Sequence, residues 1–319
     1  MISTETVFIL GAGSNFLYKF PLASDLRKNI CKDFPISFIE LIEKSDITNK
    51  GQLIEEAKDF ADKFFKSSIE SIDAFLFFNP HLSDVGKIAI TFYILNAEKI
   101  SMFREDCINP SKDWYTMLFN KMIEGLDPVD WNIFGENKVT FITFNYDRSL
   151  EFFLYESLMN SFTSADRLDL INELKKIPVY HVYGKPAYLP WEDGVQKLSY
   201  RSNFGIHEVT DFSVNLKLIN ERYDDKDYLK KIMVEISKAK EIYFLGFAYR
   251  KENLDILGVP GCITNDHRVY GTAFGVPENE IAENKVLLAK NFDHVRKGYD
   301  LPHIEDIDCY TLLRKYPLK

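Results

Sequence analysis

The sequence predicts an α/β protein with a doubly wound, mostly parallel sheet. Short, continuous apolar runs, such as residues 7–10 and 242–245, are typical of strands buried on both faces of such a sheet. These runs alternate with segments of helical periodicity, as parallel strands and their crossover helices do. The 319 residues suffice for one large sheet domain that carries a substantial insertion.

The elements before residue 130 are one strand followed by helices. The strand at 7–10 ends at Gly11-Ala12-Gly13, and a helix is expected over 22–32 after the turn at Phe20-Pro21. From 36 to 130 only helical spacing is found, so this segment is predicted to be an all-helical insertion. The spacing is carried by Leu53, Ala57, Phe60 and Phe64, by Ile69, Ile72 and Leu76, and by helices expected over 85–103 and 113–124.

Strand signals return after the insertion. A segment at 186–210 with several Pro and Gly residues is expected to be a long loop or short strands over the site. Strands are predicted at 139–143, 179–183, 242–245, 268–274 and near 308–313, and helices at 147–159, 227–239 and 278–290. The prediction is a Rossmann-like domain formed by 1–35 and 131–319, interrupted by the helical insertion at 36–130.

Composition and charge weigh against several classes of protein. The chain has 39 Lys and Arg against 48 Asp and Glu, a net charge of −9, so no direct nucleic-acid binding is expected. No apolar run reaches the 18 or so residues of a membrane span, and the start lacks the basic region of a signal peptide. We therefore expect a cytoplasmic protein. Its 14% aromatic content predicts a large core and favours an apolar surface for a partner.

The cysteines and histidines do not predict a metal site. The cysteines stand at 31, 107, 262 and 309 without a C-x-x-C pair, which excludes a zinc ribbon of that pattern and fits a reducing cytosol. The histidines at 81, 207, 267, 294 and 303 show no metal-ligand spacing. No metal is expected.

The first candidate site is the sequence GAGSN at 11–15, directly after the first strand. Glycines there let the backbone turn tightly and approach a phosphate at a helix N-terminus. The dinucleotide fingerprint G-x-G-x-x-G needs glycine at 16, where this chain has Phe16, so the dehydrogenase pattern is absent. A phosphate site of a more general kind and a plain tight turn both remain open.

Three further clusters follow the predicted strands. Thr143, Asn145 and Asp147 follow the second strand; Asn145 and Asp147 either face the ligand crevice or cap the next helix. His181 and Tyr183 are expected to share one face of the third strand, before Gly184. His181 is then either a general base or an ordinary core histidine. Gly246 and Phe247 close the fourth strand. All four clusters are expected at one edge of the sheet.

In this order, the segments GAGSN, TFNYD, HVYG and LGFAY resemble the sirtuin superfamily. The set is most similar to bacterial sirtuin-like NAD hydrolases of anti-phage defence systems, which lack the zinc ribbon of sirtuins. The insertion also carries SIDAFL at 71–76, similar to a recurring segment of that bacterial group. The similar motifs extend from residue 7 to about 257.

The resemblance implies a role for each motif. Gly11, Ala12, Gly13 and Ser14 would hold the NAD phosphates and the nearby ribose. Asn145 would position the nicotinamide ribose or the attacking water, Asp147 would bind the carboxamide, and His181 would act as the base. Gly246 would line the adenosine side, with Asn15, Thr143, Tyr183, Gly184 and Phe247 as further NAD contacts. Sirtuins place the catalytic histidine directly before the glycine, where this chain has Tyr183.

In protein-deacetylating sirtuins, the zinc ribbon helps to form the channel for the acyl-lysine substrate. Because this chain has no zinc ribbon, the resemblance implies that water is the acceptor. The expected activity is hydrolysis of NAD⁺ to nicotinamide and ADP-ribose, with NAD as substrate and without a metal. Two alternatives stay open: a module that senses NAD or ADP-ribose without cleaving it, and an ADP-ribosyl or deacylating transferase. A third interpretation is an inert scaffold with a relic pocket.

The resemblance also implies partners. The chain ends soon after its sheet, so we expect no sensor domain of its own. A toxic NAD hydrolase without a sensor should stay silent until it assembles. A homo-oligomer is therefore expected, with a separate ATPase or sensor protein of the same defence system as a further candidate partner.

Overall fold

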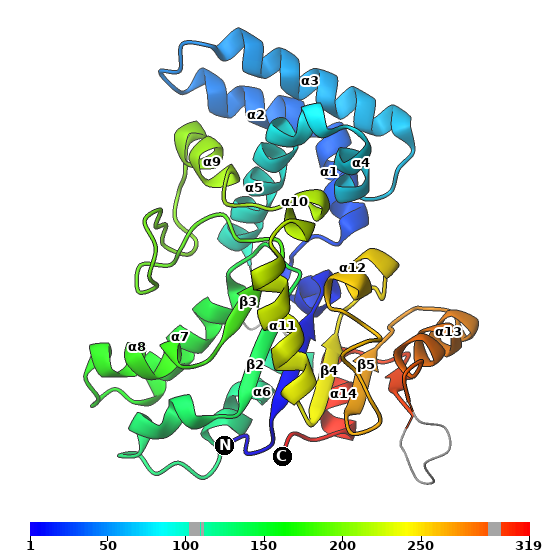
Figure 1. The fold of residues 1–319 in the computed structure, drawn as a ribbon. Helices are drawn as coiled ribbons and strands as arrows, with labels where there is room; N and C mark the ends of the chain where they lie inside the picture. Colours follow the sequence, from blue (N-terminus) through cyan, green and yellow to red (C-terminus); the bar gives the residue numbers. More distant parts are fainter. Residues whose placement is uncertain (102–108, 110–111, 293–300) are drawn as a thin grey trace.

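A computed structural model describes residues 1–101, 109, 112–292 and 301–319. In these residues six strands form one parallel sheet in the order β3-β2-β1-β4-β5-β6 (Figure 1). This order is that of a Rossmann-type sheet and confirms the predicted α/β fold class. The strands are β1 (Thr6–Leu10), β2 (Val139–Thr143), β3 (Val179–His181), β4 (Glu241–Leu245), β5 (Arg268–Thr272) and β6 (His303–Glu305).

The three central strands end at the same level. Leu10 at the end of β1 pairs with Thr143 of β2 on one side and with Leu245 of β4 on the other. Strand order reverses between β1 and β4, and ligands of such sheets bind outside the carboxyl ends at this switch point. The segments that follow these three strands therefore leave the sheet side by side.

Helices cover both faces of the sheet, and β1 shows why. Its residues alternate between two hydrophobic clusters, with Val7 and Ile9 in one and Phe8 and Leu10 in the other. The first cluster takes in the helices α1 (Ala23–Lys32), α2 (Phe34–Glu43), α3 (Lys50–Ser67), α4 (Ile72–Phe78), α5 (Ser83–Ile100), α9 (Ile206–Ser213), α11 (Lys226–Lys238), α12 (Lys251–Ile256) and α13 (Glu278–Leu288). The second takes in α6 (Trp114–Ile123), α7 (Ser149–Ser161), α8 (Arg167–Lys175) and α14 (Cys309–Lys315).

All described elements between β1 and β2 are helical. They include three short 3-10 helices, η1 (Ala12–Tyr18), η2 (Pro80–Leu82) and η4 (Trp131–Glu136). Helices α1, α4 and α5 stand beyond the carboxyl ends of the strands, together with α10 (Ile219–Tyr223) (Figure 1). Helix α6 instead packs in the second cluster. The insertion boundaries at 36 and 130 stay a prediction, and residues 102, 103 and Cys107 lie outside the described part of the chain.

The prediction of a last strand near 308–313 is wrong. Residues 308–313 do not form the last strand: they begin α14, and the sixth strand is β6, shortly before it. The Asp308 side chain accepts a hydrogen bond from Thr311 N and caps the helix. Cys309, Leu312 and Leu313 are then buried at helical spacing, which a short apolar run does not distinguish from a strand.

The loop predicted over 186–210 is found in part. Residues up to 205 form turns and bends with a single bridge between Tyr188 and Lys197, and α9 occupies the last five positions. The Glu208 carboxylate accepts a hydrogen bond from Gly205 N, which fixes the start of α9. This start signal lies inside the segment that the Pro and Gly residues marked as a loop.

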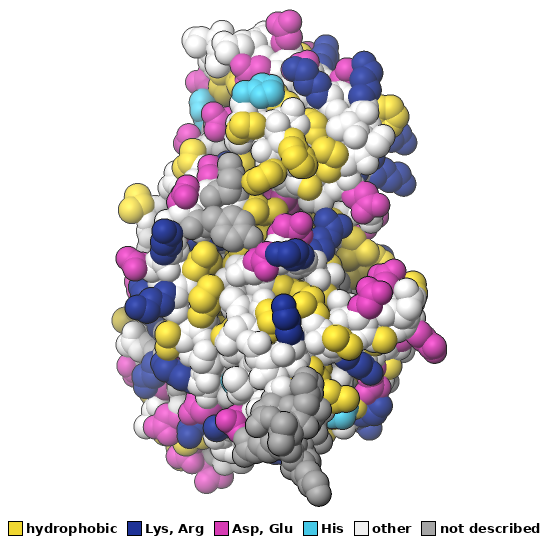
Figure 2. All heavy atoms as spheres, turned by 45° about the vertical axis from the view of Figure 1, so that its right-hand side comes forward, with side chains coloured by type: hydrophobic (Ala, Val, Ile, Leu, Met, Phe, Trp, Pro, Cys, Tyr) yellow, Lys and Arg dark blue, Asp and Glu magenta, His cyan; other side chains and the backbone are white. Residues whose placement is uncertain are grey.

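Helices α1–α5, here called the helical part, expose large apolar side chains at their surface. On α3 and α4 these are Phe65, Phe77 and Phe78, which are 63%, 52% and 70% exposed. Figure 2 shows hydrophobic side chains gathered on the upper part of one face of the molecule. Within the described residues, no helix combines the length and the apolar character that a membrane crossing requires.

Candidate functional site

The turns after β1 and β4 touch at the switch point. Gly11 N donates to Leu245 O and Gly13 N donates to Gly246 O, both at 3.0 Å. A Cβ at Gly11 would lie 2.5 Å from Gly246 O, and one at Gly13 would lie 2.9 Å from Gly246 Cα. Gly246 itself has φ of +59°. Glycine is therefore required here for backbone contact between the two turns, and the Gly11 and Gly13 amides already have acceptors.

Two side chains of η1 meet two side chains of the β2–α7 turn. Asn15 Nδ2 donates to both carboxylate oxygens of Asp147, at 2.9 and 3.0 Å. Asn145 Nδ2 donates to Ser14 Oγ at 3.3 Å, and Ser14 Oγ donates to Gly11 O at 2.8 Å. All four side chains are buried. The sheet edge thus brings together two of the predicted motifs, more than 130 residues apart in sequence.

One side-chain atom of Asn145 has no hydrogen-bond donor among the described residues. Its backbone N donates to Thr143 Oγ1 at 3.0 Å, which gives Thr143 a role in shaping the turn. Its side-chain nitrogen is held by Ser14, but none of the described residues donates a hydrogen bond to Asn145 Oδ1. A water or a ribose hydroxyl would supply the missing donor.

Asp147 is a buried carboxyl with an altered pKa. Burial raises its pKa to about 6, and the nearby Glu98 carboxylate adds to this, while hydrogen bonds from Ser149 and Asn15 limit the rise. Asp147 Oδ1 accepts from Ser149 N, the first residue of α7, at 3.1 Å. The carboxyl therefore holds the start of the helix and also titrates near neutral pH.

Helix α6 covers this cluster. The sequence predicted a helix over 113–124 but not its position against the cluster. Trp114 Nε1 donates to Ser14 O and the Tyr115 hydroxyl donates to Asn15 Oδ1, both at 2.8 Å. Tyr115 thereby fixes Asn15 with its nitrogen toward Asp147. The only signal in the sequence is the Trp-Tyr pair itself, because a buried indole and a buried phenol each require an acceptor.

His181 lies next to this cluster, with partners at both ring nitrogens. Nδ1 is 3.2 Å from Asn145 O, and Nε2 is 2.7 Å from Glu151 Oε1. The Lys185 ammonium contacts the same Glu151 oxygen at 2.7 Å. Burial opposes ionisation of Glu151, but the charges and hydrogen bonds of Lys185 and His181 hold its pKa far below the usual range. Glu151 and Lys185 were not among the predicted residues.

His181 and Tyr183 do not share a strand face, contrary to the prediction. Strand β3 ends at His181, and a turn follows in which Gly184 N donates to His181 O. Strand alternation no longer applies beyond that point. His181 contacts α7 through Glu151, while the Tyr183 hydroxyl donates to Asn253 Oδ1 of α12 at 2.9 Å.

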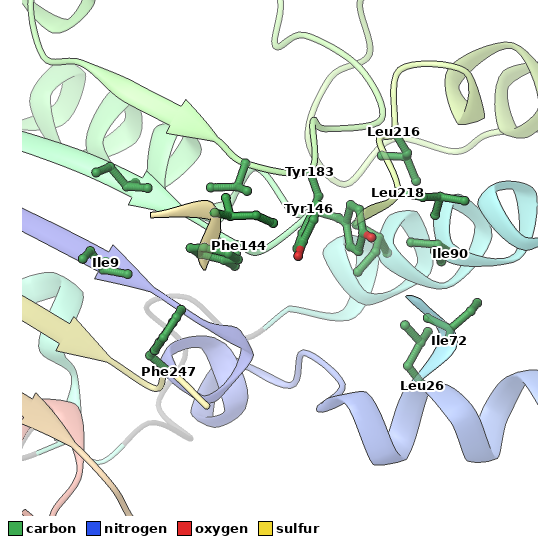
Figure 3. Packing of buried hydrophobic residues seen from close by; sticks show 14 of the residues in the cluster. Ile9, Leu26, Ile72, Ile90, Phe144, Tyr146, Tyr183, Leu216, Leu218 and Phe247 are labelled. Carbon is green, nitrogen blue, oxygen red and sulfur yellow. The ribbon is translucent and has the colours of Figure 1, made fainter. Parts of the chain in front are cut away.

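Aromatic side chains fill the space on the helical side of the sheet edge. The rings of Tyr183 and Phe247 pack against Phe144 with centroids 5.6 and 5.1 Å apart. Tyr146 packs against Tyr183, and its hydroxyl donates to Asp73 of α4 at 2.9 Å. Burial raises the pKa of Asp73. Figure 3 shows these rings facing apolar residues of the helical part, labelled Leu26, Ile72 and Ile90.

A cavity of about 900 Å³ lies beside the predicted site, between η1, α1, α2 and α5. Its lining includes Phe16, which directly follows Asn15, together with Leu17 and Lys19. None of the predicted site residues lines it. Of those residues, Ala12, Gly13, Gly184 and Gly246 are partly exposed, and the others are buried.

The described residues contain no group of three or more His, Cys, Asp or Glu side chains arranged to hold a metal ion. No known protein-family model matches this chain, and no curated protein matches it either.

Proposed function

We propose that this protein binds NAD⁺ at the carboxyl ends of β1, β2 and β4 and hydrolyses its nicotinamide–ribose bond. The observation that carries the proposal is the pairing of Asn15 with Asp147 and of Ser14 with Asn145 at the switch point. A Rossmann-type strand order and a glycine contact between β1 and β4 accompany it. This edge is where sheets of this order bind dinucleotides.

The reaction requires few groups from the protein. The ribose C1′–nitrogen bond breaks, its electron pair neutralises the pyridinium ring of the departing nicotinamide, and a water oxygen bonds to C1′. The water proton must then leave. In its ionised form, Asp147 accepts this proton and also stabilises the positive charge that develops on the ribose. Asn145 Oδ1, without a donor among the described residues, orients the water or a ribose hydroxyl.

In this proposal Asp147 is the base rather than a contact of the carboxamide, and the role of His181 also differs from the one that the resemblance implies. Both of its ring nitrogens contact acceptors, the Asn145 carbonyl and the Glu151 carboxylate. Both nitrogens are thus engaged by protein groups of the β2–α7 segment. His181 therefore acts as a positioning residue, which holds the Asn145 backbone at the sheet edge.

Release of nicotinamide from NAD⁺ tests the proposal directly. Purified wild-type protein is incubated with NAD⁺, at concentrations that span its monomer and any oligomer, and the products are separated by chromatography. Asn145→Ala and Asp147→Asn should each lower the rate by about 10²-fold or more. Asn160→Ala, on the exposed end of α7, is the control. No release by wild-type protein in any assembly state would overturn the proposal.

A binding-only module is the second candidate. It is favoured by the occupied ring nitrogens of His181 and by the burial of Asn145 and Asp147, which are 7% and 6% exposed. Calorimetry with NAD⁺ and with ADP-ribose separates the two candidates. Saturable heat without nicotinamide release favours the module, whereas release favours the hydrolase.

We further propose that the hydrolase depletes cytoplasmic NAD in an anti-phage defence system and acts as an assembly. The exposed Phe65, Phe77 and Phe78 on the helical part support an interface there, with a second copy or with an ATPase or sensor protein. Light scattering across a concentration series, paired with nicotinamide release, tests this. A monomer that is fully active alone would contradict it.

A further inference from the structure

A fully buried ion pair joins the helical part to the turn that carries Asn145 and Asp147. Glu98 lies in the last turns of α5, and Arg148 directly follows Asp147. Glu98 Oε1 accepts from Arg148 Nε at 3.1 Å, and Glu98 Oε2 accepts from Arg148 Nη2. The side chains are 1% and 0% exposed, respectively. Two charges are therefore held without contact with bulk solvent.

The same carboxylate also holds the backbone of the turn. Arg148 N donates to Glu98 Oε1 at 3.1 Å, so the main chain just after Asp147 is fixed by a side chain of α5. The third guanidinium nitrogen, Nη1, donates to Leu198 O at 2.6 Å. This arrangement uses Arg148 as a rigid, multidentate link between three segments of the chain.

A second, neutral bridge runs parallel to the ion pair. The Tyr200 hydroxyl lies 3.2 Å from Ser101 Oγ, just beyond α5, and 3.1 Å from Ser149 Oγ, at the start of α7. Both bridges connect the end of α5 to residues 148 and 149. The turn between β2 and α7 is thus held at two successive residues.

Stability alone does not account for this ion pair. Removing two charges from water is costly, and well-packed apolar residues in place of a buried pair are often neutral or stabilising. What the pair adds is a defined position for the groups that it joins. We infer that Glu98 is a positioning residue, through which α5 sets the position of Asn145 and Asp147. The catalytic consequence of this inference rests on the proposed function.

The test replaces the pair by side chains of similar size without charge. In the Glu98→Met/Arg148→Met double variant, the core stays filled and the ionic link to the turn is lost, while the Tyr200 bridge remains. The matched control is Asp59→Met/Lys63→Met, which removes an exposed pair on α3. Hydrogen exchange read by mass spectrometry on the peptide that contains 145–149 is the readout that does not depend on NAD.

We expect the double variant to retain a cooperative melting transition while peptide 145–149 exchanges about ten-fold faster or more, a change confined to this peptide. The control should leave that peptide unchanged. If the proposed hydrolysis holds, kcat should also fall by about 10²-fold with a smaller change in KM. Unchanged exchange at 145–149 would overturn the inference, whether or not wild-type protein cleaves NAD⁺.

If the double variant does not fold, the test uses Glu98→Gln instead, because this substitution keeps the shape of the side chain. Its exchange is measured below its melting temperature and compared with that of Glu56→Gln on the exposed face of α3. Local loss of protection at 145–149 supports the inference. Equal protection in the two variants contradicts it. Inactive wild-type protein together with local loss of protection would count against the hydrolase alone.

Discussion

Asn15 donates its side-chain amide to both oxygens of Asp147, and the two residues are 132 positions apart in the sequence. This contact joins the turn after β1 to the turn after β2. It stabilises the charged form of a carboxyl whose burial favours the neutral form. The balance leaves a titrating acid at the switch point of the sheet.

The first prediction concerns stability against pH. The pKa of Asp147 rises from an ordinary value of 3.8 to about 6 on folding, a difference that corresponds to about 3 kcal/mol. Because the folded value is the higher one, this contribution is fully present below pH 3.8 and is lost as the pH rises through about 6. Asp147→Asn should remove it.

Urea unfolding of wild type and Asp147→Asn between pH 4 and 7.5 checks this prediction. The free energy of unfolding of the wild type, relative to the variant, should fall by up to about 3 kcal/mol across the window. The other carboxyl groups are the same in both proteins, so their contributions to the free energy of unfolding cancel in the difference. Asp127→Asn, at an exposed position, should follow the wild type. A constant difference between wild type and Asp147→Asn would refute the assignment.

The second prediction concerns the charges around His181. Lys185 is 13% exposed and contacts Glu151, which is 8% exposed. Lys185→Met leaves this carboxylate with less compensation, and should lower the free energy of unfolding by about 3 kcal/mol. Lys175→Met removes an exposed pair with Asp193 and should cost less than about 1 kcal/mol. Thermal melts at pH 7 compare the two variants. Similar losses of stability would show that the Lys185 pair contributes no more to stability than the exposed Lys175 pair.

The third prediction concerns the glycine contact. A Cβ at Gly246 would overlap the backbone nitrogen of Ser14, and its φ of +59° disfavours other residues. Gly246→Ala should therefore cost more than about 4 kcal/mol. Gly275 has φ of +73°, but a Cβ there would have no atom within 4 Å, so Gly275→Ala should cost only about 1–2 kcal/mol. Equal melting temperatures for the two variants would contradict the steric argument.

Much of the fold follows from short-range patterns. The apolar runs of β1, β2 and β4 are buried at all five positions, and such strands have a clear sequence signal. The carboxyl ends of parallel strands meet at one edge of the sheet. This predicted that Asn15, Ser14, Asn145 and Asp147 lie close together, as they do. Both predictions use local features of the sequence: an apolar run for each strand, and a position directly after that run for each site residue.

The rest depends on packing between distant segments. Tyr115 contacts Asn15 across 100 residues, and Glu98 contacts Arg148 across 50, and neither pairing has a local pattern. The Tyr183 prediction failed for a local reason instead: a turn ends β3 two residues early. Side-chain alternation is reliable only as far as the strand continues.

The last prediction separates positioning from proton transfer at His181. If the ring only holds the Asn145 carbonyl, His181→Ala should lower kcat/KM for NAD⁺ by less than Asn145→Ala does. His181→Gln, which can donate to one of the two acceptors, should recover part of the loss. A catalytic base would behave differently, because Gln cannot accept the proton and would be as inactive as Ala. Steady-state kinetics of the three variants at several pH values decide between the two roles. Loss by His181→Gln equal to that of His181→Ala, and as large as that of Asn145→Ala, would restore His181 as the base.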